Sequence, residues 1–181
     1  SGMIDNSTDR SMSFENYIGA SSTSYIIMSG NGGSVTRDNI PTATNIIFPV
    51  GTSTTYNPIT LQTSTGGLPD ITVRLKNAGT PAIPTSSTQL NIQWDLQSSV
   101  ANTVISSATL NWLPANVIGG IITNGEVQFA NYAISTWTRQ GATPISTSVS
   151  IPAPVTIQVN NTFDYSLTVF KSLDYYSIGN A

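Results

Sequence analysis

Apolar and polar residues alternate with a period of two in several short segments of the chain. In the clearest one, Ile71, Val73 and Leu75 alternate with Thr72 and Arg74. The same alternation places further apolar residues on one face of their segments: Leu90, Ile92, Trp94 and Leu96; Ala108, Leu110 and Trp112; Val155, Ile157 and Val159; Leu167 and Val169. Because successive side chains of a strand point to opposite faces, we predict antiparallel sheets with one packed and one wet face.

Turn-forming residues separate these segments at the spacing typical of all-β domains. Further strands are predicted over 25–28, 34–37, 46–50 and 59–61, and a Gly-rich turn is predicted over 29–33. No segment carries a convincing apolar stripe with helical period. The pattern therefore predicts an all-β fold, an antiparallel β-sandwich of immunoglobulin-like or jelly-roll-like type with little or no helix.

The alternation also predicts which large side chains fill the core. Trp94 and Trp112 are in phase with the apolar residues of their segments, so we expect both between the sheets. Residues 1–12 are polar, and they begin with a sequence that resembles a tag remnant. We therefore expect 1–12 to be a flexible, irregular segment and 13–181 to form one sandwich domain.

The segment 48–58 is interpreted as a structural clip on the sandwich. Pro49 lacks a backbone donor, so its strand is predicted to end there or to lie at a sheet edge. Gly51 is expected to take a positive φ, and Pro58 to fix the direction of the next strand. Three large side chains are expected to fold the loop onto the sandwich: Phe48, Val50 and Tyr56. In the alternative interpretation, Tyr56 is exposed and contacts a ligand.

Composition narrows the chemistry that such a fold could carry out. Only 8% of the 181 residues are charged, and the chain has neither His nor Cys. The usual general base, most zinc ligands and all thiol chemistry are therefore missing, and we expect no cofactor. The net charge of −3, with scattered cations, disfavours a nucleic-acid partner. No apolar stretch is long enough to predict a membrane span.

The acidic and nucleophilic residues do not form a recognisable catalytic pattern. Glycoside hydrolysis needs two carboxylates close together in a cleft, and no spacing pairs the nine acids in this way. Asp95 is expected on a polar, solvent-facing strand face, and Asp38 and Asp70 beside turns. A serine nucleophile would need Lys76 or Lys171 as its base, and no Ser-x-x-Lys spacing occurs. We predict that the chain is not an enzyme and has no catalytic or metal-binding residues.

Three aromatic residues are candidates for binding sugar rings by stacking. They are Trp137, Tyr175 and Tyr176. In the simpler interpretation, Trp137 fills the core and one of the two tyrosines covers it. Exposed coplanar aromatic rings would instead indicate a carbohydrate-binding module.

An ordered series of short motifs suggests a family. The motifs are Gly19-Ala-Ser-Ser-Thr-Ser-Tyr25, the Gly30–Gly33 turn, Ser34-Val-Thr-Arg37, Phe48-Pro-Val-Gly51, Tyr56-Asn-Pro58, Leu61, Val73-Arg-Leu75, the tryptophan strand Leu90–Leu96, Leu110-Asn-Trp112, Ala130-Asn-Tyr132 and Trp137. The series resembles an FPVG-type β-rich module of large secreted surface proteins of Bacteroidetes, often found near a C-terminal type IX secretion sorting domain. The resemblance covers roughly residues 17 to 140. It implies an adhesin-like parent protein, and it carries over no catalytic residues.

These observations predict a non-catalytic structural or adhesive module at an extracellular or outer-membrane-attached cell-surface location. Its expected partner is the rest of a larger surface protein, with glycans or another cell surface as candidate ligands. The alternative is a carbohydrate-binding module. A hydrolase with paired acids is the third and least favoured interpretation.

Overall fold

The computed structural model describes residues 3–5, 11–14, 19–28, 33–64, 66–77, 89–120, 125–131, 136–139, 148–151, 157–159, 162–163 and 165–171. This described part is all-β, and its single helical element is a 3₁₀ turn, η1 (Pro114–Asn116). The predicted fold class is therefore confirmed. Most of the predicted turn over 29–33 lies outside the described residues.

The larger sheet has nine strands, and its main path follows the order β12-β9-β17-β10-β8-β4-β2. β13 pairs with β17, and β14 extends the sheet from β13. The strands are β2 (Ser11–Phe14), β4 (Ser34–Arg37), β8 (Ile71–Asn77), β9 (Gln89–Leu90), β10 (Ile92–Ser98), β12 (Val117–Ile118), β13 (Gly125–Asn131), β14 (Thr136–Arg139) and β17 (Tyr165–Lys171). All neighbours are antiparallel except β2 and β4, which run parallel.

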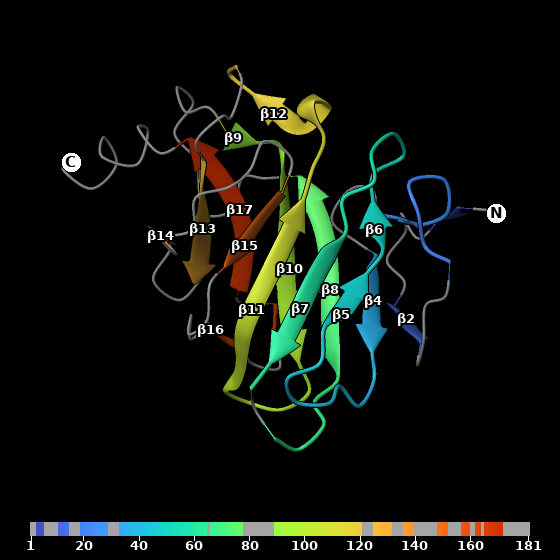
Figure 1. Ribbon diagram of the computed structural model, residues 1–181, viewed down its shortest axis with the longest axis vertical. Helices are drawn as coiled ribbons and strands as arrows, with labels where there is room; N and C mark the ends of the chain where they lie inside the picture. The colour runs from blue at the N-terminus through green and yellow to red at the C-terminus, as the bar shows by residue number, and fades with distance from the viewer. Residues whose placement is uncertain are drawn as a thin grey trace.

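The second sheet has five strands in the order β15-β11-β7-β5, and β16 also pairs with β11. They are β5 (Ile46–Phe48), β7 (Ile59–Thr63), β11 (Thr103–Asn111), β15 (Ser148–Ile151) and β16 (Ile157–Val159). Strands β5, β7 and β11 lie in front of β4, β8 and β10 in Figure 1, which shows the two layers of the sandwich. A small parallel sheet of three strands completes the fold: β1 (Ile4–Asp5), β3 (Ile26–Ile27) and β6 (Val50–Gly51).

The core lies between the two layers and contains both tryptophans that the alternation selects. Trp94 and Trp112 are 0% and 1% exposed, respectively. Trp94 lies opposite Leu75 of β8 on one side and Leu167 of β17 on the other. Its indole Nε1 donates a hydrogen bond of 3.0 Å to the carbonyl of Asn57, so the ring is fixed by packing and by a polar contact.

Two predictions about exposed segments are wrong. The N-terminal segment is not irregular at Ile4–Asp5 and Ser11–Phe14, which add short parallel strands beside β3 and β4. The polar faces of the central strands are also not wet, because Gln93 and Asp95 of β10 are fully buried. Ser166 and Thr168 on the neighbouring β17 are buried in the same way. Strands in the middle of this sheet are therefore covered on both faces, and their polar side chains need internal partners.

The segment 48–58 changes sheet at its proline and then folds into a hairpin. β5 ends at Phe48 as the edge strand of the five-stranded sheet, and β6 begins after Pro49 in the small sheet. The Asn57 amide donates to the carbonyl of Val50 at 2.9 Å, which closes the hairpin. The predicted effect of Pro49 on strand pairing is confirmed, since a residue without a backbone donor separates the two strands.

Gly51 is required for a reason other than the predicted positive φ. Its φ is not in the left-handed region, so that prediction is wrong. A Cβ at Gly51 would instead lie 2.3 Å from the carbonyl oxygen of Thr55 and 2.5 Å from a ring carbon of Tyr25. Steric crowding by a backbone atom and by a buried ring excludes a larger residue here.

Replacing Gly51 with alanine should therefore lower the free energy of unfolding by about 2 to 3 kcal/mol, through overpacking. Gly66→Ala is the matched control, because nothing lies within 4 Å of a Cβ built there and its φ is not left-handed. Urea denaturation of the two variants and the parent chain measures the difference. Equal stability of Gly51→Ala and Gly66→Ala would contradict the crowding at the hairpin.

Candidate functional site

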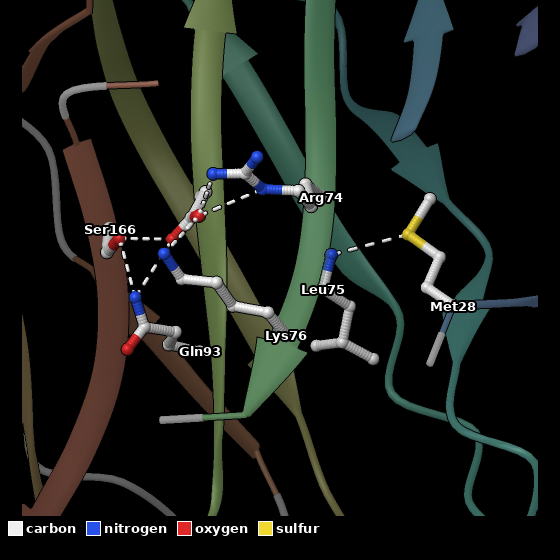
Figure 2. A network of polar contacts seen from close by, with 7 residues as sticks. Met28, Arg74, Leu75, Lys76, Gln93 and Ser166 are labelled. Atoms are coloured by element: carbon white, nitrogen blue, oxygen red, sulfur yellow. Dashed lines mark hydrogen bonds and ion pairs between the residues drawn. The ribbon is translucent and has the colours of Figure 1, made fainter. Parts of the chain in front are cut away.

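The most heavily bonded polar side chain in the described part is the carboxylate of Asp95, which is fully buried. Its Oδ2 accepts from Arg74 Nη2 at 2.7 Å and Nε at 3.1 Å, and it lies 2.8 Å from Lys76 Nζ. Its Oδ1 accepts from Gln93 Nε2 at 3.0 Å and from the Ser166 hydroxyl. Figure 2 shows Arg74 and Lys76 reaching from β8 toward Gln93 and Ser166. We call these five residues the Asp95 cluster.

Strand register brings the Asp95 cluster together. Asp95 of β10 lies directly opposite Arg74 of β8 and Ser166 of β17, and Gln93 lies opposite Lys76. All five side chains therefore project from the face of the sheet that points away from the tryptophan core. The guanidinium of Arg74 also lies over the Phe163 ring, with its carbon 4.2 Å from the ring centroid.

This arrangement corrects the prediction that Asp95 faces solvent, and it limits the chemistry that the carboxylate can perform. Both oxygens are occupied by cationic and neutral donors from three neighbouring strands. A carboxylate acting as a nucleophile or general base must instead reach a proton or reacting atom of a substrate. The geometry is that of a cross-link between β8, β10 and β17.

A second buried polar network joins the hairpin at 50–57 to η1. Asn57 Nδ2 donates to Asn116 Oδ1 at 2.7 Å, and Thr55 Oγ1 donates to Asn57 Oδ1 at 2.7 Å. Asn116 Oδ1 also accepts from the backbone amide of Leu113 at 3.1 Å. Asn57 and Asn116 are both buried, so these bonds hold two surface loops at a fixed separation.

Between these two loops lies a groove of about 360 Å³, at the end of the five-stranded sheet. Its lining is uncharged and consists of Ile47, Tyr56, Pro58, Thr60, Asn111, Trp112 and Leu113. Ile47 and Leu113 are 50% and 42% exposed, which makes them the apolar rim. We call this hollow the Tyr56 groove.

Tyr56 is held in place by a second tyrosine behind it. The ring centroids of Tyr25 and Tyr56 are 5.2 Å apart, with the planes tilted by 39°. The Tyr25 hydroxyl donates to the carbonyl of Thr52 at 2.9 Å. Burial raises the pKa of both phenols above the ordinary value of 10.0, which already lies well above physiological pH, so both hydroxyls are neutral.

The aromatic residues proposed for sugar stacking are not brought together in the described part. Trp137 belongs to β14, where its backbone pairs with Ala130, but its side chain is outside the described part. Tyr175 and Tyr176 lie outside the described residues altogether. Sequence reasoning considered Tyr56 as a ligand contact but missed Thr60 and Asn111. In the sequence, Thr60 and Asn111 are marked only by an outward position on a predicted strand. Most polar strand residues share that position, so it does not single out a binding residue.

No group of three or more His, Cys, Asp or Glu side chains in the described ranges could hold a metal ion. Within the same ranges, no helix has the length and apolar character needed to cross a membrane.

Comparison of the sequence with known proteins identifies no related family or protein. The chain matches no model of a known protein family, and no curated protein shows significant sequence similarity to it. The Asp95 cluster and the Tyr56 groove are the features of the described part that bear on function.

Proposed function

We propose that this chain is a non-catalytic structural or adhesive module of a larger bacterial surface protein, at an extracellular or outer-membrane-attached location. The observation that carries the proposal is the Asp95 cluster. This cluster uses a fully buried carboxylate to tie three adjacent strands together rather than to face a substrate.

Several features of the chain fit this role. β8 and β10 pair along seven residues, and ion pairs from β8 to Asp95 reinforce that ladder in a chain without cysteine. Three of the fifteen charged residues of the chain, Arg74, Lys76 and Asp95, meet in this internal cross-link. The resemblance to FPVG-type modules of type IX-secreted Bacteroidetes proteins supports the same setting. The expected partners are the rest of the parent protein and glycans or another cell surface.

Surface location is tested with antibodies raised against the purified chain. We expect them to label intact cells of the organism that produces the protein, and external protease to remove the signal. An antibody against a cytoplasmic protein provides the control for cell integrity. Labelling that requires permeabilised cells would contradict the proposed location.

Carbohydrate binding is the second candidate function, and the Tyr56 groove favours it. The groove combines an aromatic ring with uncharged hydrogen-bonding groups, which are the usual means of recognising a sugar. In this version the module would contribute directly to adhesion by holding a surface glycan.

A further inference from the structure

We propose that the Tyr56 groove is a binding site for a neutral saccharide, with the sugar ring against Tyr56 and its hydroxyls bonded to Thr60 and Asn111. The inference deepens the proposed adhesive function, because it assigns the ligand class and the residues that bind it. It names contact residues other than Trp137, Tyr175 and Tyr176, whose side chains lie outside the described part.

The polar groups in the groove have unused hydrogen-bonding capacity. Within the described part of the chain, the hydroxyls of Tyr56 and Thr60 make no hydrogen bond. The side chain of Asn111 makes one long contact, from Nδ2 to the carbonyl of Pro58 at 3.4 Å, and its Oδ1 has no partner there. Two hydroxyls and an amide offer both donors and acceptors. Each sugar hydroxyl can likewise donate one hydrogen bond and accept others, so the two sets are complementary.

The absence of charge in the lining selects among ligand classes. None of the residues around the groove is ionisable except Tyr56, and a tyrosine hydroxyl is neutral at physiological pH. An anionic ligand such as a phosphate or an acidic sugar would find no cation for a charge-assisted bond. A neutral sugar has an apolar C–H face for the Tyr56 ring and for the rim residues Ile47 and Leu113, and it needs no counter-charge.

The groove is preorganised by the contacts around it. Tyr25 supports the Tyr56 ring from behind, and the Asn57–Asn116 bond fixes the distance between the hairpin and the chain at Leu113. A volume of about 360 Å³ falls within the size of small-ligand sites. Since the walls are already ordered, binding would not require the site to form first.

The test measures binding of the purified chain to an array of neutral and acidic glycans, followed by calorimetry with the strongest neutral ligand. Tyr56→Ala removes the platform, and Thr60→Val removes one hydroxyl while keeping the side-chain shape. Thr44→Val, at an exposed position that does not line the groove, is the matched control. Thermal unfolding of each variant shows whether it is folded under the assay conditions. If Tyr56→Ala does not fold, the glycan affinities of Thr60→Val and Asn111→Ala test the proposal instead.

We expect neutral glycans to bind, with affinity about tenfold or more weaker in Tyr56→Ala and several-fold weaker in Thr60→Val. Thr44→Val should bind like the parent chain. Three results would overturn the proposal: no neutral glycan is bound, only acidic glycans or peptides are bound, or the groove variants bind as tightly as the parent. Because these measurements use the isolated chain, they are independent of the cell-labelling result.

Discussion

Trp94→Ala is expected to lower the free energy of unfolding by about 4 to 5 kcal/mol, close to the whole stability of many domains. The indole is 0% exposed and lies between residues of β8 and β17, so truncation leaves a cavity in the centre of the core. The carbonyl of Asn57 also loses its indole donor. Urea denaturation at constant pH gives the difference, provided the variant still folds.

Trp94→Phe separates packing from hydrogen bonding in the same position. It keeps most of the buried ring and removes the Nε1 donor, so we expect a loss of about 1 to 3 kcal/mol. Ile118→Ala is the control, because Ile118 is 49% exposed and should change stability little. A Trp94→Ala variant as stable as Ile118→Ala would mean that the strand faces are reversed.

Asp95→Asn is expected to lower the free energy of unfolding by about 3 to 5 kcal/mol, the cost of removing one partner from a buried ion pair. The substitution keeps the shape of the side chain but leaves Arg74 and Lys76 next to each other without their anion. Their side chains are only 21% and 11% exposed, so water cannot fully replace the lost carboxylate. The loss should depend weakly on salt, because the carboxylate is buried and poorly screened.

Asp38→Asn is the matched control for the loss of a carboxylate. Asp38 is only partly buried, and it accepts a hydrogen bond from Ser13 at the surface. We expect its replacement to change stability by about 0.5 kcal/mol or less. If Asp95→Asn is no more destabilising than Asp38→Asn, the Asp95 cluster does not stabilise the sheet, and the observation behind the proposed function is lost.

The Asp95 cluster and the Tyr56 groove support different parts of the proposed function. The Asp95 cluster concerns how the module keeps its shape, and the Tyr56 groove concerns what it holds. They lie on different sheets, and no residue of the groove lining belongs to the cluster. Stability and binding should therefore respond to different substitutions, so each can be tested without the other.

The sequence by itself determined the all-β class, the positions of the longer central strands, and the core face of β8, β10 and β11. Strand periodicity is a local property, because burial of one face selects apolar residues at every second position. Trp94, Trp112 and the residues around Ile71–Leu75 could be assigned on this basis, and their burial agrees. The break at Pro49 was also predictable, since proline lacks a backbone donor wherever it occurs.

Only the tertiary structure decided which residues face one another. Asp95 meets Arg74, Lys76 and Ser166 because of strand order and register, which pair residues that are 19 to 71 positions apart. Gly51 is required because the carbonyl of Thr55 and a distant ring, that of Tyr25, both crowd it. The Tyr56 groove likewise forms where a hairpin, an edge strand and the end of β11 converge. The alternation of apolar and polar residues predicts that a side chain points away from the core. Strand pairing between distant segments determines whether that side chain then contacts water, a charge or a ligand.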